Sequence, residues 1–270
     1  MIFSWMDEKE LIYKAFLSIL FMGYFDTVRH VVVKADIVLL VVDARMPELA
    51  RNNELEGLVR AMKKTLVIVF NKCDLISQSD LTKLKNKFKN AFFVSAGKNE
   101  GISKLRTQLY IMAKQIGIDL PHIGVVGYPN VGKSALINVL ARGSRTKVSS
   151  VAGTTKGVQW VKVGKFRVID SPGVITYKEN EERLGFIGAK NPEQIQNPES
   201  VACEIISHCM EKNKKALEEF YGISIGNEEL YDVLLIIGKQ RGYLAKGGIV
   251  DEKRTAISIV RDWQKGKLKV

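Results

Sequence analysis

Residues 127–134 read GYPNVGKS and fit G-x-x-x-x-G-K-[ST], the pattern of a loop that cradles phosphate. The apolar run HIGVV at 122–126 is typical of a strand, and ALINVLA at 135–141 has helical spacing. The loop is therefore expected to join a strand to a helix. A turn in this place aims backbone N–H groups and the positive end of the helix at a phosphate. A glycine-rich turn without a ligand is the alternative interpretation.

The side chains of this loop have separate expected roles. Lys133 can reach the outer phosphates of a nucleotide, and the Ser134 hydroxyl can hold Mg²⁺. We predict that the loop contributes these residues to a nucleotide site: Asn130, Val131, Gly132, Lys133, Ser134 and Ala135.

Three further apolar runs predict a parallel sheet around the loop. They are IVLLVV at 37–42, LVIVF at 66–70 and AFFV at 91–94, and helical stretches at 53–63 and 80–89 separate them. Continuous β-branched runs are typical of strands that are buried on both faces. Strands alternating with helices form a doubly wound α/β sheet, which binds its ligands at the carboxyl ends of the strands.

Two of these strand ends carry residues suited to a guanine base. The run NKCD follows the second strand, and Ser-Ala-Gly follows the third. The Asp74 carboxylate offers two acceptors for the two adjacent donors of guanine, and the stem of Lys72 can lie along the ring. Asn71 can bond both the base edge and the phosphate loop, and the Ala96 N–H can donate to the guanine oxygen. We expect the base to be bound by Asn71, Lys72, Cys73, Asp74, Ser95 and Ala96.

Two downstream motifs complete the set expected of a GTP switch. GTTK at 153–156 precedes a predicted hairpin turned at Gly164, and Asp-Ser-Pro-Gly at 170–173 closes it. Thr155 is expected to bind Mg²⁺ and the outer phosphate, Asp170 to face Mg²⁺, and the Gly173 N–H to face the γ-phosphate. The Mg²⁺ ligands are thus predicted to be Ser134, Thr155 and Asp170, with Lys133 and Gly173 in catalytic support. Without a nucleotide, the same residues would be ordinary turn formers.

In this arrangement the chain resembles the translation-factor class of GTPases, with its motifs in an unusual order. The usual order is phosphate loop, threonine switch, DxxG, NKxD and SA[KG]; here NKCD and SAG come first, and GYPNVGKS, GTTK and DSPG follow. That order resembles the circularly permuted GTPases. The DARMP stretch at 43–47 and the segment that starts GKQRGYLAKGG at residue 238 resemble the YlqF/RbgA group of ribosome-assembly GTPases. Ala152, where that group often has proline, is a small departure.

The resemblance implies further properties. With strands numbered in chain order, the family fold implies the spatial order five, six, four, one, two, three, with strand five antiparallel. Asn130 matches an asparagine that related GTPases use to place K⁺. Val174 stands where Ras-type proteins have a water-orienting glutamine, so we expect slow hydrolysis by the isolated chain, roughly 10⁻⁴ to 10⁻³ per second, and acceleration by a partner.

The region beyond residue 180 predicts a small helical domain. Asn197 and Pro198 suit the start of a helix that runs to about Tyr221 and stops at Gly222. Asn227 is predicted to cap a second helix, and Asp251 a third. We therefore divide the chain into a circularly permuted GTPase domain at 1–179 and a helical, basic C-terminal domain at 180–270.

The charge of the chain favours an anionic partner. Its formal net charge is +12, and residues 238–270 hold nine Lys or Arg against three Asp or Glu. We expect Lys246, Lys253 and Arg254 to bind RNA, because nearby glycines allow close approach to phosphates. The resemblance implies the large ribosomal subunit and its rRNA as the partner, with no DNA. A solvated basic surface, a lysine-rich proteome, or a protein partner gripped in a GTP-dependent way are the alternatives.

Other features indicate a location and exclude some functions. The three cysteines have neither zinc-ligand nor disulfide spacing, so a reducing compartment is expected. The apolar run at 11–25 contains Lys14 and is too short to span a bilayer, which favours a packed helix and a cytoplasmic protein. An ATP-using P-loop kinase is a further hypothesis; it predicts ATP binding and tolerance of Asp74→Ala.

Overall fold

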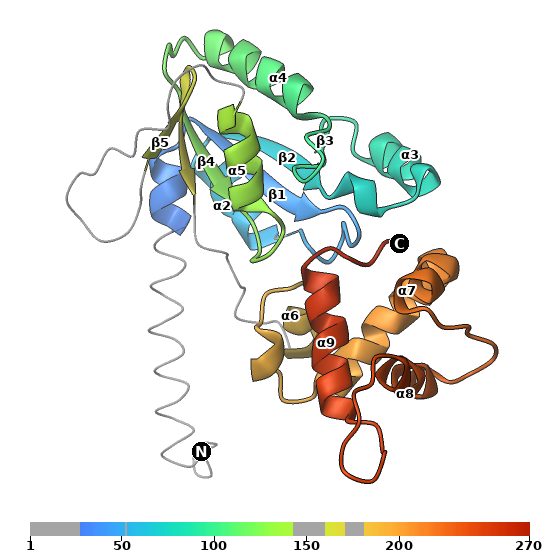
Figure 1. Cartoon of the computed structure of the whole chain (residues 1–270). Helices are drawn as coiled ribbons and strands as arrows, with labels where there is room; N and C mark the ends of the chain where they lie inside the picture. The colour runs from blue at the N-terminus through green and yellow to red at the C-terminus, as the bar shows by residue number, and fades with distance from the viewer. Residues whose placement is uncertain (1–27, 52, 143–159, 171–180) are drawn as a thin grey trace, which may run out of the picture.

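The computed structural model describes residues 28–51, 53–142, 160–170 and 181–270 (Figure 1). Its centre is a six-stranded sheet in the order β3-β2-β1-β4-β6-β5. The strands are β1 (Ile37–Asp43), β2 (Thr65–Asn71), β3 (Phe92–Phe93), β4 (His122–Val126), β5 (Trp160–Val163) and β6 (Phe166–Asp170). This order, with β5 antiparallel to β6, is the one implied by the resemblance.

The middle of the sheet is parallel and fully covered. β1 pairs with β2 on one side and with β4 on the other, both in parallel, and all seven residues of β1 are buried. A strand buried on both faces must be apolar throughout, which is why the run at 37–42 is continuous rather than alternating. β6 then pairs in parallel with β4.

Helices cover both faces of the sheet. α5 lies on one face with α4 against it, and α2 lies on the other (Figure 1). The bounds are α2 (Asn53–Ala61), η1 (Cys73–Leu75), α3 (Gln78–Lys87), α4 (Ile102–Gln115) and α5 (Lys133–Arg142). The predicted helix at 80–89 begins two residues earlier, because the Ser77 side chain accepts a hydrogen bond from the Asp80 N–H and caps it.

The remaining helices gather at the carboxyl end of the sheet (Figure 1). They are α6 (Glu181–Phe186), η2 (Pro192–Gln194), α7 (Pro198–Tyr221), α8 (Leu230–Gln240) and α9 (Glu252–Gln264). The predicted caps of the first and third long helices are present: Asn197 accepts from the Ser200 N–H, and Asp251 from the Arg254 N–H. Gly222 ends α7 in the left-handed region, with φ 66°.

Two helical details differ from the prediction. α8 begins at Leu230, after Glu229, and Asn227 does not cap it. α7 is broken at Asn213, whose φ of −158° and ψ of 71° are non-helical. The Asn213 side chain accepts a hydrogen bond from the Ala216 N–H at 3.1 Å, so this residue caps the second half of the helix.

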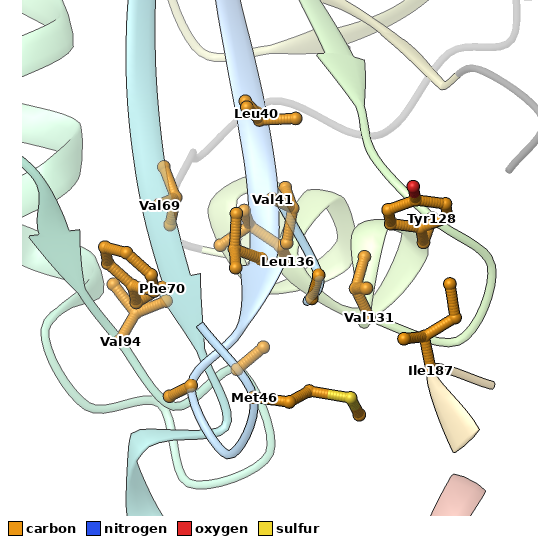
Figure 2. Packing of buried hydrophobic residues seen from close by; sticks show 14 of the residues in the cluster. Leu40, Val41, Met46, Val69, Phe70, Val94, Tyr128, Val131, Leu136 and Ile187 are labelled. Carbon is orange, nitrogen blue, oxygen red and sulfur yellow. The ribbon is translucent and has the colours of Figure 1, made fainter. Parts of the chain in front are cut away.

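One continuous apolar core joins the sheet to the C-terminal helices. Figure 2 shows part of it, where the side chains come from strands, from the residues that follow β1, β3 and β4, from α5 and from the segment after α6. Those labelled are Leu40, Val41, Met46, Val69, Phe70, Val94, Tyr128, Val131, Leu136 and Ile187. The phosphate-loop residues Tyr128 and Val131 are each 1% exposed. Burial of these two side chains fixes the loop to the body of the protein.

Some predictions fall on residues outside the described ranges. These are the helix at 11–25, the GTTK motif with Thr155, and Gly173 with Val174. The predicted boundary between residues 179 and 180 also lies at the edge of such a range and stays a prediction. No helix in the described part of the chain has the length and apolar character needed to cross a membrane.

Candidate functional site

The predicted phosphate loop joins β4 to α5, as the sequence indicates. Gly127 and Gly132 have φ of 143° and 97°. A Cβ atom on Gly127 would lie 2.4 Å from the Val41 carbonyl oxygen, and one on Gly132 would lie 2.3 Å from Asn71 Nδ2. Both positions therefore require glycine, and the loop passes directly against the ends of β1 and β2.

Lys133 lies inside this loop. Its side chain is buried, and Nζ donates to the carbonyl oxygens of Gly127 at 3.1 Å and Tyr128 at 2.8 Å. The next two residues, Ser134 and Ala135, are exposed at the start of α5. The arrangement puts an ammonium group, a hydroxyl and a helix N-terminus at one place, which is the chemistry that a polyphosphate needs.

Asn71 joins three segments. Its Nδ2 donates to the Val131 carbonyl at 2.9 Å, and its Oδ1 accepts from the Ala96 N–H at 2.9 Å. The contact with the phosphate loop agrees with the prediction. The Ala96 N–H, predicted to face a guanine oxygen, donates to Asn71 in this structure, so the contacts of both residues with a base stay predictions.

Lys72 is held by a residue from the end of β1. Its backbone is left-handed, with φ 62°, and its Nζ lies 2.8 Å from Asp43 Oδ2. Burial lowers the pKa of Lys72, although Asp43 opposes this effect. Burial raises the pKa of Asp43, but the charges of Arg45 and Lys72 together hold it below the usual range, so Asp43 is a carboxylate.

Cys73, Asp74 and Ser95 lie together at the neighbouring strand ends. Cys73 Sγ donates to the Phe70 carbonyl at 3.3 Å, and burial raises the pKa of the thiol to about 12, which makes this cysteine an inert packing group. The buried Ser95 hydroxyl accepts from the Lys98 N–H at 3.1 Å. A cavity of about 530 Å³ opens beside these residues, and its lining includes Cys73, Asp74, Ser95 and Lys98.

The register of the sheet places one predicted Mg²⁺ ligand, Asp170, near the phosphate loop at backbone level. β6 pairs with β4 so that Asp170 lies opposite Val125, two residues before the phosphate loop. Ser134 begins α5 on the other side of that loop. Hydroxyl and carboxylate oxygens are hard ligands that suit Mg²⁺, and the roles of Ser134 and Asp170 as its ligands stay predictions. Thr155, the third predicted ligand, is outside the described residues.

Asn130, the predicted K⁺ ligand, contacts the C-terminal helices. Its φ is 58°, and its Nδ2 donates to the Gly188 carbonyl at 2.8 Å. Gln264 Oε1 of α9 lies 3.5 Å from the same Nδ2. The contact links the phosphate loop to α9, and the K⁺ role stays a prediction.

Two of the predicted RNA-binding residues, Lys253 and Arg254, lie at the start of α9. Lys246, Lys253 and Arg254 are all exposed. The Arg254 guanidinium lies 4.7 Å from the centroid of the Tyr243 ring, whose hydroxyl is 3.1 Å from Ser258 Oγ. One face of Tyr243 is thus occupied by Arg254, and a cavity of about 500 Å³ beside the pair is lined by Lys253 and Arg254 among others.

Known proteins are similar to this chain in sequence and in fold. The family described as RsgA GTPase matches residues 20–179, and that described as 50S ribosome-binding GTPase matches residues 122–239. An uncharacterized GTP-binding protein of Methanocaldococcus jannaschii is 41% identical over 244 residues, which are 89% of this chain and 65% of that protein. Ribosome biogenesis GTPase A of Bacillus cereus is 30% identical over 252 residues, which are 86% of this chain and 84% of that protein.

A solved structure supports the same fold. The crystal structure of GNP-bound YlqF from T. maritima superposes with a TM-score of 0.56 at 23% sequence identity, over 87% of this chain and 90% of that one. The parallel sheet, the phosphate loop and the adjoining NKCD strand end define the class of P-loop GTPases. Within that class, the chain belongs to the RsgA GTPase family and is related to ribosome biogenesis GTPase A. The predicted GTPase class and its relation to ribosome biogenesis factors are confirmed.

Sequence reasoning did not find one group in this region. Asp43 and Arg45 belong to the DARMP stretch, which stands out in the sequence only by its resemblance to a family, yet both are buried beside the NKCD loop. Two opposite charges directly after a fully apolar strand were the available signal, because buried charges must be paired.

Proposed function

We propose that this chain binds GTP with Mg²⁺ and hydrolyses it to GDP and phosphate while it acts as an assembly factor on the large ribosomal subunit. The observation that carries the proposal is the position of Asn71. Its side chain bonds the phosphate loop at Val131 and the Ser-Ala-Gly loop at Ala96, so that one residue ties the predicted phosphate and base sites together. An unrelated glycine-rich turn has no reason to be joined to a guanine-type motif in this way.

The residues present suit each part of the reaction. Lys133 and the N-terminus of α5 would hold the outer phosphates, and Asp74 would accept from the guanine donors. Ser134, Asp170 and Thr155 would hold Mg²⁺, which neutralises charge on the phosphate oxygens when it is bound. The Gly173 N–H would face the γ-phosphate. Because Val174 cannot orient water, a group from the partner would do so.

The proposal includes a circularly permuted GTPase domain followed by a helical, basic C-terminal domain. The motif order supports the permutation, since residues 71–74 precede residues 127–134 in the chain while the two segments touch in space. Exposed lysine and arginine side chains at Lys246, Lys253 and Arg254 support contact with rRNA phosphates. The alternative is GTP-dependent binding of a protein partner without RNA. The salt dependence of binding to large subunits distinguishes the two.

The test is GTP turnover with and without purified large ribosomal subunits. We expect roughly 10⁻⁴ to 10⁻³ per second for the chain alone and a clear acceleration by large subunits but not by small ones. Asp74→Ala should abolish the preference for GTP over ATP, because the carboxylate no longer reads the base. Fast turnover that no subunit changes, or guanine preference that survives Asp74→Ala, would contradict the proposal. If the K⁺ role of Asn130 holds, K⁺ should raise the rate where Na⁺ does not.

A further inference from the structure

Arg45 is a buried side chain that none of the nucleotide motifs contains. It follows β1 and is 3% exposed. Its Nε and Nη2 bond the two carboxylate oxygens of Asp43 at 3.1 and 2.9 Å, and its Nη1 donates to the Trp263 carbonyl oxygen at 2.9 Å. The guanidinium carbon also lies 3.7 Å from the centroid of the Trp263 ring. Arg45 therefore fixes the end of β1 to α9, through a planar pairing with Asp43 and a cation–π contact.

The same carboxylate holds Lys72, the residue expected to lie along the guanine ring. Asp43 Oδ2 accepts from Lys72 Nζ at 2.8 Å as well as from Arg45. Lys72 is a largely buried cation, and a buried cation is stable only beside a partner. Because Arg45 sets the orientation of the Asp43 carboxylate, it also sets where the Lys72 ammonium lies.

α9 packs against α6, and the residues that follow α9 reach the nucleotide-binding part of the chain. Trp263 is fully buried, and its Nε1 donates to the Phe186 carbonyl at 2.7 Å. After α9 the chain returns to the NKCD loop, where the Val270 N–H donates to the Leu75 carbonyl at 2.8 Å. A Cβ atom on Gly266 would lie 3.1 Å from Leu75 Cδ1. The segment after α9 thus contacts Leu75, the residue that follows NKCD, while α9 itself is joined to Asp43 through Arg45.

We propose that Arg45 is a positioning residue for guanine recognition, which makes the affinity for guanine nucleotides depend on the seating of α9. The connection runs from Trp263 through Arg45 and Asp43 to Lys72. It rests on the proposed function, in which Lys72 belongs to the guanine site. A polyanion that shifted α9 on binding would change the affinity of the chain for nucleotide. By linkage, the nucleotide would change the affinity for the polyanion by the same factor.

A purely stabilising role for Arg45 makes a different prediction, which a double-mutant cycle detects. If Arg45 acts through Lys72, its effect on nucleotide affinity disappears once Lys72 is removed. If Arg45 only stabilises the fold, its replacement has the same effect on affinity whether or not Lys72 is present. Arg45→Lys suits the cycle, because it keeps the positive charge beside Asp43 but loses the planar pairing and the stack on Trp263.

The experiment measures the dissociation constant of fluorescent GDP for the full chain. Arg45→Lys and Trp263→Leu are each made in the unaltered chain and in Lys72→Ala, and circular dichroism verifies the fold. We expect each to weaken GDP binding about tenfold in the unaltered chain and less than about twofold in Lys72→Ala. Trp263→Leu leaves the Arg45–Asp43 pair in place and carries the test if Arg45→Lys does not fold.

The matched control is Arg106→Lys. Arg106 is also a partly buried arginine, whose Nη2 donates to the Val139 and Leu140 carbonyls at 3.2 and 3.1 Å, far from the NKCD loop in the sequence. It should lower stability without a Lys72-dependent loss of GDP affinity. The inference would be overturned if Arg45→Lys left GDP affinity unchanged, or lowered it equally in the unaltered chain and in Lys72→Ala. The proposed function would remain intact in either case. Failure of the unaltered chain to bind GDP would overturn the proposed function and the inference with it.

Discussion

At the scale of single residues, the nucleotide site depends on close contacts that leave no room for a side chain. Gly132 is the clearest case, because its φ of 97° is unfavourable for other residues and a Cβ atom would meet Asn71 Nδ2 at 2.3 Å. Asn71 in turn bonds Val131 and Ala96. A single methyl group at Gly132 would therefore disturb both loops of the site.

Gly132→Ala should cost roughly 1 to 3 kcal/mol of stability and lower GDP affinity at least tenfold. Equilibrium urea unfolding and fluorescent GDP titration measure the two effects.

Gly57→Ala is the matched control. Gly57 lies within α2, and a Cβ atom added there meets nothing within 4 Å. This change should stabilise the protein by about 0.5 to 1 kcal/mol and leave GDP affinity unaltered. Unchanged GDP binding by folded Gly132→Ala would show that the contact with Asn71 does not shape the site.

At this scale the motifs in the sequence named candidate site residues but not the buried residues that support them. Lys133 lies within the phosphate loop and Asn71 contacts that loop at Val131, while the contacts of both residues with a nucleotide stay predictions. Besides Asp43, Arg45 bonds Trp263, 218 positions later in the chain. No local pattern records such a contact, since it depends on how separate elements pack together.

At the scale of elements, helix boundaries followed capping chemistry. Asn197 and Asp251 cap their helices through the predicted side-chain hydrogen bonds. The prediction for Asn227 was wrong because Glu228 closes a turn there, by accepting a hydrogen bond from the Gly226 N–H. Asn227 thus lies inside a turn, and an extended Glu229 precedes the helix. Turn and cap chemistry use the same residue types, so the sequence alone does not separate them.

The cap of α9 gives a prediction for this element. Asp251→Ala removes the acceptor for the Arg254 N–H, now at 3.0 Å, and should destabilise the protein by about 1 kcal/mol. Asp251→Asn keeps an acceptor oxygen and should recover most of the loss. Thermal and urea unfolding of the three proteins provide the measurement; equal stability of Asp251→Ala and the unaltered chain would argue against a stabilising cap.

At the scale of the whole molecule, the strand order agrees with the order implied by the resemblance to permuted GTPases. Hydrophobic runs alone predicted strands and helices but not their neighbours in space. The seating of α9 against β1 and the NKCD loop was also beyond the sequence. It depends on a shared core in which Ile187, after α6, packs with residues of the sheet and the phosphate loop (Figure 2).

The charge distribution predicts a salt-dependent interaction with the large subunit. Replacing Lys246 and Arg254 by alanine should weaken cosedimentation and reduce the slope of log affinity against log salt by about 0.7 to 0.9 for each lost phosphate contact. The measurement is cosedimentation with large subunits in a non-hydrolysable GTP analogue across salt concentrations.

Lys34 and Lys114 give a control pair, because both are exposed lysines outside the C-terminal helices. Their replacement by alanine removes the same formal charge and should leave the salt slope unchanged. A slope unaffected by the Lys246 and Arg254 changes would favour a protein partner over RNA.

The conformation of Lys133 has a consequence for nucleotide exchange. In the structure its ammonium group donates to two carbonyl oxygens of its own loop, at Gly127 and Tyr128. The buried Lys133 ammonium would therefore keep hydrogen-bond acceptors after a nucleotide leaves, because the loop itself supplies them. If Lys133 binds phosphate as proposed, these carbonyl oxygens would accept its hydrogen bonds again once GDP has left, so we expect GDP release to need no exchange factor to compensate the charge.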